Sequence, residues 1–402
     1  MKSYPFVRTG LIVLTLIALL LTAAPQSARA AGLITVTSAA DSVGSDGLCT
    51  LREAIANANN DAATYGDCAA GSGADTITFA PALAGGIISL TTIGDTTLGP
   101  TALGITSNIT ILGDANDGLT IERSGSAPDM RLFYVSAGGN LTLKYLTLQG
   151  GLARGFAGGT AFNGGTGGGA AGVGGAIFNR GSVTLDSVTL LNNQAIGGNG
   201  GDNVDGSNWL YSGSGGSGLG GGIFNRSAML TLLNVTLANN AVSAGAAGSA
   251  NDPGANGGRD GSEIYVYGSA SVVNTTNSIA ANNSSAYNHF VNDGGTVNGS
   301  HNLVMRASGV PAEVILSAAD PLLELLGDNG GATFTFALEA GSPAVNAGTG
   351  SGAPVLDQRG AGRDEMPDIG AYEVMGGEWL VDSAADTVAN DGQTTLREAV
   401  QM

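Results

Sequence analysis

The chain has 402 residues, of which 67 are glycine, and its 15 basic and 33 acidic side chains give a formal net charge of −18. A hydrophobic share of 43% is too high for a disordered tail, and glycine without an unbroken every-third-residue period excludes collagen. Because the acidic excess repels polyphosphate, nucleic acid is not an expected partner.

The first thirty residues have the features of a secretory signal peptide. Lys2 and Arg8 precede an apolar run from Leu11 to Ala24, and Ala28 to Ala30 supply small residues for cleavage. We expect residues 1–30 to be removed and the mature chain to be exported. A membrane anchor is the weaker alternative, because the run is shorter than the roughly 20 residues that span a bilayer, and we expect no transmembrane segment after cleavage.

Cys49 and Cys68 are the only two cysteines of the chain. Export to an oxidising compartment permits a disulfide, so we expect the two residues to be bridged. Two free thiols are the alternative.

A capping helix is expected directly after the first cysteine. Thr50 and Glu53 form a capping box, with Thr50 at the N-cap and Glu53 at the third helical position. The helix that follows places Leu51 and Ile55 on one apolar face. We expect this face to cover the exposed end of the fold, because stacked strands need a cap.

The middle of the chain repeats itself. GGAIFNR at Gly174 to Arg180 returns as GGGIFNR at Gly220 to Arg226, and each copy is followed by two short strands that end in Asn-Asn. A unit of about 22 residues with three short strands cannot bury its own apolar side. Such units stack on one another at about 4.8 Å, which predicts an all-β fold, a parallel β-helix (solenoid).

Asparagines and glycines punctuate these repeats. We expect the paired asparagines at turns, where stacked amides bond from one coil to the next. The glycine stretches 150–174 and 197–222 show no hydrophobic period and are expected to be loops on one side of the solenoid. The paired asparagines are Asn192, Asn193, Asn239, Asn240, Asn282 and Asn283.

Three motifs resemble known families. Residues 49–55 (CTLREAI) resemble the CSLREA module, with Thr50 in place of its serine, and residues 320–373, with LDQRG and PDIGAYE, are similar to the choice-of-anchor Q domain. The GGAIFN repeats resemble those of polymorphic outer membrane proteins. Together these resemblances imply a right-handed, pectin-lyase-like β-helix in a bacterial secreted or surface protein, and they imply no activity.

The chain end repeats its beginning. Residues 382–400 match residues 37–55 at 12 of 19 positions, with Thr394 in the place of Cys49. We expect the tail to be poorly ordered or to dock opportunistically, and the chain to be a fragment of a longer tandem protein or a truncated product. The expected segments are the signal peptide 1–30, the CSLREA-like cap and first coil 31–80, the β-helix coils with glycine-rich loops 81–319, the choice-of-anchor Q-like C-terminal coils 320–375, and a truncated second CSLREA-like module 376–402.

The aligned repeats do not supply a catalytic site. A polysaccharide lyase or hydrolase needs paired carboxylates or an acidic calcium site with a base. Instead we align Asp186 with Asn234, and the repeated charged position holds Arg180 and Arg226, interpreted as solvated turn residues with an acidic glycan as the alternative contact. The ionisable residues interpreted as structural or surface groups are His289, His301, Asp357, Arg359, Arg363, Asp368 and Glu373.

Two further sites are candidates. Gly197 to Asp205 fits a calcium nonapeptide once, with Asp202 as ligand, but such sites need stacked copies, so no cofactor is expected beyond this weak calcium candidate. Trp209 and Tyr211 lie in a loop where rings either stack on sugars or clamp the loop. We expect a secreted or cell-surface protein with a structural, adhesive or glycan-contacting role, and a polysaccharide lyase or glycoside hydrolase is the alternative.

Overall fold

The computed structural model describes residues 32–113, 118–162, 166–204, 211–281, 287–331 and 333–375. All 29 strands within them pair in parallel, in five sheets, and they are accompanied by one α-helix and two short 3-10 helices. The all-β, parallel fold expected from the sequence is therefore confirmed. The expected leader 1–30 and the second module 376–402 lie outside the described residues. None of the described helices is long and apolar enough to cross a membrane.

The β1 sheet contains eight strands whose buried and outward residues alternate. In residues 140–144, Leu141 and Leu143 are buried, as the period of two in the sequence predicts. Leu143 lies in register between Ile111 and Leu185 on the neighbouring strands. The strands, in sheet order, are β1 Leu33–Val36, β2 Ala74–Phe79, β5 Asn108–Leu112, β8 Asn140–Lys144, β13 Ser182–Asp186, β18 Met229–Leu233, β23 Val272–Thr276 and β26 Thr296–Ser300.

The β3 sheet also contains eight strands, and threonines occupy one row of its outward face. Thr147, Thr189 and Thr236 are in register on three neighbouring strands. All three are buried, because another part of the chain covers this face. The strands, in sheet order, are β3 Ile87–Leu90, β6 Leu119–Arg123, β9 Leu146–Gln149, β14 Thr189–Leu191, β19 Thr236–Ala238, β24 Ile279–Ala281, β27 Asn302–Val304 and β29 Ile315–Ser317.

The β4 sheet contains seven strands and carries the Ile-Phe-Asn residues of each GGxIFNR motif. Ile177 pairs with Ile223, Phe178 with Phe224 and Asn179 with Asn225. The shared Ile-Phe-Asn residues of the two motifs therefore occupy equivalent places in neighbouring repeats. The strands, in sheet order, are β4 Thr101–Ile105, β7 Arg131–Val135, β12 Ile177–Asn179, β17 Ile223–Arg226, β22 Ile264–Tyr267, β25 Phe290–Asp293 and β28 Ala307–Ser308.

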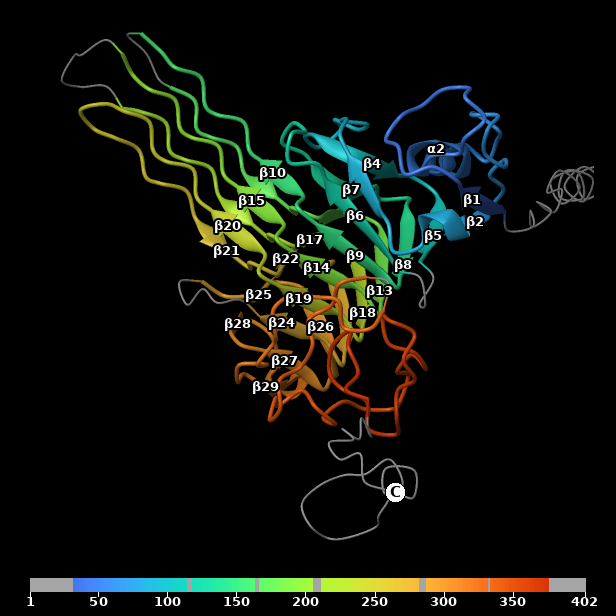
Figure 1. The fold of residues 1–402 in the computed structure, drawn as a ribbon. Coiled ribbons are helices and arrows are strands. Elements are labelled where there is room, and N and C mark those ends of the chain that lie inside the picture. The colour runs from blue at the N-terminus through green and yellow to red at the C-terminus, as the bar shows by residue number, and fades with distance from the viewer. Residues whose placement is uncertain are drawn as a thin grey trace, which may run out of the picture.

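The chain visits the three large sheets in rotation, for example β12, β13 and β14, then β17, β18 and β19. Inward side chains of all three sheets form one apolar cluster, in which the same aliphatic position recurs from repeat to repeat. Each Å² of apolar surface that is buried stabilises the fold by about 25 cal/mol, so this cluster is the main source of stability. Figure 1 shows the sheets as a stacked body, with the N-terminal end of the described chain at one end of the stack.

Sharp corners join the β1 sheet to the β3 sheet. The residue at each corner has φ between 49 and 55°, a left-handed conformation that asparagine tolerates better than most residues. Asp186 pairs with Leu233, and Ser187 takes the corner that Asn234 takes in the next repeat. The alignment of Asp186 with Asn234 is therefore wrong by one residue. The corner residues are Tyr145, Ser187, Asn234, Asn277 and His301.

The paired asparagines form the expected ladder after the β3 sheet. Asn192 and Asn239 are left-handed and exposed, whereas Asn193 and Asn240 are fully buried. Asn193 Nδ2 donates to Asn240 Oδ1 at 2.9 Å, and Asn240 Nδ2 donates to the Leu190 carbonyl oxygen at 3.0 Å. Buried amides that bond to one another and to the backbone fix the register of neighbouring repeats. Asn282 and Asn283 lie outside the described residues.

The N-terminal cap has the expected geometry. Helix α2, Leu51–Asn60, begins with a complete capping box, in which Thr50 N donates to Glu53 Oε2 at 3.0 Å. Its apolar face, with Leu51 1% and Ile55 3% exposed, joins the core beside β1, β2, β4 and β5. A disulfide joins Cys49 and Cys68, with 4.8 Å between the Cα atoms, so the predicted bridge is confirmed.

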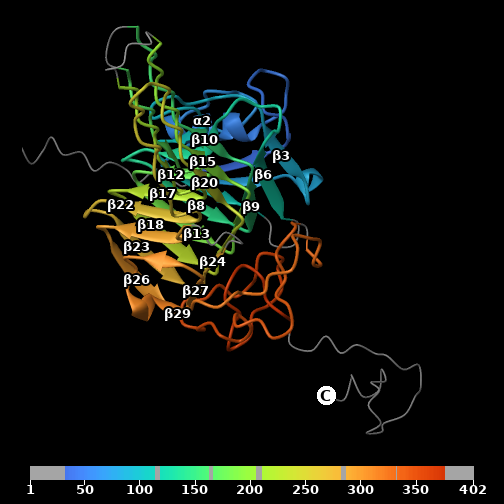
Figure 2. The ribbon, with the colours of Figure 1, turned by 90° about the vertical axis from the view of Figure 1, so that its left-hand side faces the viewer.

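The C-terminal segment, residues 318–375, covers part of the outward face of the β3 sheet. Gln358 bridges the threonine row: Thr189 Oγ1 donates to its Oε1 at 2.6 Å, and its Nε2 donates to Thr147 Oγ1 at 2.8 Å. Ala371 N donates to Thr236 Oγ1 at 2.9 Å. Figure 2 shows this segment, in red, alongside the stacked strands. The two 3-10 helices, η1 Pro81–Leu83 and η2 Ala312–Val314, lie outside it.

Candidate functional site

Three glycine-rich excursions project together from one side of the body (Figure 1). We call the described residues of 152–174, 194–220 and 241–261 the glycine arm. At its base the outgoing segments form one small parallel sheet and the returning segments form another. These sheets consist of β10 Leu152–Arg154, β15 Gln194–Ile196 and β20 Ala241–Ser243, and of β11 Gly172–Val173, β16 Gly218–Leu219 and β21 Arg259–Asp260.

Beyond these strands, backbone hydrogen bonds continue along the glycine arm at every third residue. Such a spacing is that of a polyproline II-like chain, which has three residues per turn and bonds only to its neighbours. Outgoing segments bond to one another and to returning segments, so all three excursions form one array. Examples are Gly155 N to Ile196 O, Gly158 N to Asn199 O, Gly197 N to Ser243 O, Gly200 N to Ala246 O, Gly198 N to Ala170 O and Gly201 N to Gly167 O, all between 2.7 and 2.9 Å.

Glycine is required where these segments touch. A Cβ at Gly158 would lie 1.9 Å from the Gly167 carbonyl oxygen, and one at Gly200 would lie 1.9 Å from the Gly213 carbonyl oxygen. At Gly159 a Cβ would meet nothing within 4 Å. The expectation that the glycine stretches project from one side is confirmed. They are not irregular loops, however, because backbone hydrogen bonds hold them in a regular array. The missed signal was local, since glycine or alanine recurs every third residue inside each stretch.

Aromatic side chains stand out from the glycine arm. Phe156, Phe162 and Tyr211 are 68%, 71% and 68% exposed, and Trp209 lies outside the described residues. Phe156 and Phe162 are six residues apart, which is two turns of a three-residue period, so they lie on the same side of their segment. At about 3.1 Å per residue, their Cα atoms are about 19 Å apart. Composition alone did not single out these two phenylalanines.

Asp202 has a structural contact in the glycine arm. Its Oδ1 accepts the Ser249 backbone N–H at 2.7 Å, and its carbonyl oxygen accepts the Ala161 N–H at 3.0 Å. The carboxylate therefore joins two neighbouring excursions. Within the described ranges, His, Cys, Asp and Glu form no group of three that would hold a metal ion.

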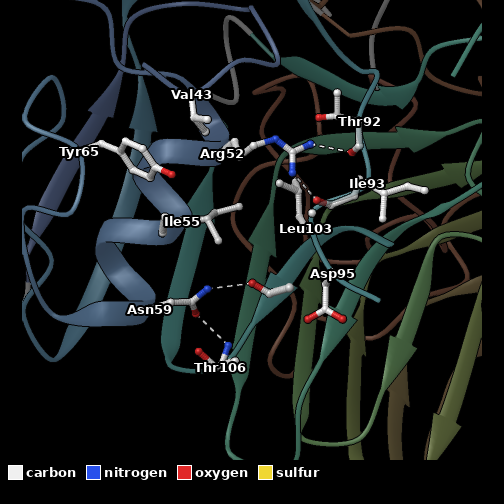
Figure 3. Close-up of a pocket in the computed structure, with 14 residues that line it drawn as sticks. Val43, Arg52, Ile55, Asn59, Tyr65, Thr92, Ile93, Asp95, Leu103 and Thr106 are labelled. Carbon is white, nitrogen blue, oxygen red and sulfur yellow. Dashed lines mark hydrogen bonds between the residues drawn. The ribbon is translucent and has the colours of Figure 1, made fainter. Parts of the chain in front are cut away.

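A groove of about 450 Å³ lies between α2 and residues 92–106 (Figure 3). Arg52 crosses it, with Nη1 2.6 Å from the Ala102 carbonyl oxygen and Nη2 2.7 Å from Asp41 Oδ1. Asn59 donates to the Gly104 carbonyl oxygen at 2.8 Å. Burial alone would raise the pKa of Asp41, but the Thr91 N–H and Arg52 together lower it by more. The pKa is therefore below its ordinary value, and the carboxylate stays charged. These polar groups bond across the groove and fasten the cap to the body.

The expected charge cluster of the C-terminal segment is a buried ion-pair network. Arg359 Nη2 lies 2.8 Å from Asp357 Oδ2, and Arg363 Nη1 lies 2.8 Å from Glu373 Oε2. Burial raises the pKa values of Asp368 and Glu373 and lowers that of Arg363. These side chains are almost inaccessible to solvent, so the network fastens the segment and is closed to a large substrate. His289 is also fully buried.

Comparisons with protein-family models, curated proteins and solved structures found no match to this chain. Membership of the CSLREA and choice-of-anchor Q families therefore stays a prediction from the motifs at 49–55 and 320–373.

Proposed function

We propose that the protein is a secreted or cell-surface protein of bacterial type, with a right-handed parallel β-helix body and a structural, adhesive or glycan-contacting role. The rotation of the chain through three sheets and the stacked repeats support the β-helix. The signal-like leader and the disulfide between Cys49 and Cys68 support export. Nucleic acid is no part of the proposal, because the chain is strongly acidic.

The observation that carries this proposal is the glycine arm with its exposed rings. An array bonded through its backbone holds side chains at fixed spacings, so little conformational entropy is lost on binding. Phe156, Phe162 and Tyr211 present apolar faces that stack on the C–H face of sugar rings. The arm projects from the body and reaches a ligand on another surface without obstruction by the sheets (Figure 1).

A non-catalytic role is the better proposal for the described residues. The carboxylate pairs that acid–base cleavage needs lie about 5 to 10 Å apart in an open groove. The close carboxylates Asp357, Asp368 and Glu373 are instead buried and bonded to arginine or backbone groups. Asp186 is also mostly buried and pairs with Lys144 at 2.7 Å.

The test removes the rings of the glycine arm. The mature chain is screened on a glycan array, and the triple variant Phe156→Ala, Phe162→Ala, Tyr211→Ala is compared with it. Stacking losses predict at least a tenfold weaker retention of the bound glycan. Phe334→Ala, which removes a 55% exposed ring from the C-terminal segment, is the matched control. Equal retention by parent and triple variant would overturn the role of the arm.

A further inference from the structure

The outward face of the β4 sheet carries two rows of side chains beside the base of the glycine arm. One row is aromatic: Tyr134, Phe178, Phe224 and Tyr265 are in register, with neighbouring ring centroids 5.3 to 5.8 Å apart. The second row lies two residues further along each strand. Figure 2 shows β12, β17 and β22, which carry these rows, stacked below the arm.

Two arginines stand next to each other in the second row. Asn179 pairs with Asn225, and neighbouring strands are about 4.8 Å apart, so Arg180, directly after β12, lies next to Arg226 at the end of β17. Both are exposed, and neither forms an ion pair within the described residues. Like charges directly opposite each other on neighbouring strands are destabilising, and an anion between them removes that repulsion.

Most other basic residues of the described chain have partners, although Arg259, like Arg226, is exposed and lies against a tyrosine ring, with its Cζ atom 5.8 Å from the centre of the Tyr287 ring. The chain has a net charge of −18, so cations are scarce in it. Arg123 and Arg131 bond to backbone carbonyl oxygens. The cations paired with carboxylates are Arg52, Lys144, Arg154, Arg359 and Arg363.

An aromatic ring continues the arginine row. Tyr267 pairs in register with Arg226, and the Arg226 Cζ atom lies 5.8 Å from the centre of its ring. The Tyr267 ring stacks on Phe224, with centroids 6.3 Å apart, yet Tyr267 remains 45% exposed. A neighbouring ring and two guanidinium groups are the groups that bind a sugar carrying a negative charge. The nearest carboxylate of the row, Asp293, pairs with Tyr267 on the side away from Arg226.

We propose that Arg180, Arg226 and Tyr267 form a binding site for an acidic polysaccharide, in which a carboxylate or sulfate lies between the two guanidinium groups and a sugar ring lies against the tyrosine. Guanidinium binds both anions in bidentate geometry. This site is separate from the rings of the glycine arm, so either can fail without the other. A polyphosphate ligand is disfavoured by the acidity of the whole chain.

The test measures binding of the mature chain to polygalacturonate, to heparin and to neutral dextran. We expect binding to at least one acidic polymer that weakens as salt rises, and none to dextran. Polygalacturonate binding alone identifies a carboxylate ligand, and heparin binding alone identifies a sulfate ligand. Binding to neither acidic polymer, or equal binding to dextran, overturns the proposal.

The variants Arg180→Gln and Arg226→Gln separate this site from general electrostatics. The double variant should lose at least tenfold in affinity for the acidic polymer, whereas its unfolding temperature without ligand should not fall, because repulsion has been removed. Arg154→Gln, which removes one exposed cation that pairs with Asp129, should change the affinity less than twofold. A double variant that binds like the parent, or a control that weakens binding equally, contradicts the proposal.

Discussion

Neighbouring glycines of the arm provide a matched pair of substitutions. In Gly158→Ala the new Cβ would lie 1.9 Å from the Gly167 carbonyl oxygen, 2.5 Å from the Gly167 carbonyl carbon and 2.7 Å from the Gly201 nitrogen. All three are backbone atoms, so no side chain can rotate to make room. In Gly159→Ala the Cβ would meet nothing within 4 Å, and the φ of Gly159 is not left-handed.

The two substitutions should therefore have opposite effects on the arm. Ordinary carbon–oxygen contact requires a backbone shift of about 1.5 Å at Gly158, and overpacking of this kind costs about 1–3 kcal/mol. Gly159→Ala should be neutral or should stabilise by a few tenths of a kcal/mol, because alanine restricts the unfolded chain.

Amide hydrogen exchange measures this difference locally. A loss of about 1–3 kcal/mol predicts roughly 5- to 150-fold faster exchange at the arm amides of Gly155, Gly158 and Gly200 in Gly158→Ala, with the body unchanged. Gly159→Ala should exchange like the parent at these positions. Equal exchange in the two variants would show that the backbone array does not hold the arm together.

Two further predictions concern the body. Leu51→Asp places a charge at a position that is 1% exposed in the cap, so it should lower the free energy of unfolding by several kcal/mol and expose the strand edges; a variant that melts and elutes like the parent would refute the capping role. Burial raises the pKa of Asp75 by more than the Ser72 N–H lowers it, so the pKa in the folded state lies above the ordinary value of 3.8. The contribution of Asp75 to stability is therefore complete below about pH 3.8 and is lost as the pH rises through the folded-state pKa. Asp75→Asn should remove this pH dependence in urea unfolding between pH 3 and 7, and an unchanged slope would contradict this assignment.

Much of the body could be predicted because its signals are local and repeated. The alternation of Leu141 and Leu143, the capping box at Thr50 and the asparagine pairs each reflect one physical requirement that recurs along the chain. The corner alignment was wrong because Ser187 and Asn234 differ in sequence but share a left-handed conformation, which the letters alone do not reveal.

The glycine arm was harder to predict because its bonds join the backbones of separate segments, both within one excursion and between neighbouring excursions. Gly158 and Gly159 are neighbouring glycines that the sequence does not distinguish. Residues 167 and 201 pack against Gly158 and leave no room for a Cβ there, whereas Gly159 has room for one. The sequence did align Arg180 with Arg226, but the aromatic partner of Arg226 was not predicted, because Tyr267 lies beside it only when β17 and β22 are in register. That Phe156 and Phe162 lie on the same side of their segment can be inferred only when the three-residue period of the backbone is known.

Recovery of a glycan after prolonged incubation tests the central claim most directly. The mature chain is incubated with the glycan that the array selects, and the solution is assayed for bound glycan, new reducing ends and unsaturated uronates. The proposed role predicts that the glycan is retained, that retention depends on the arm rings, and that its length is unchanged. New reducing ends or unsaturated uronates that increase with time and with protein concentration would contradict it and would identify the protein as a polysaccharide-cleaving enzyme.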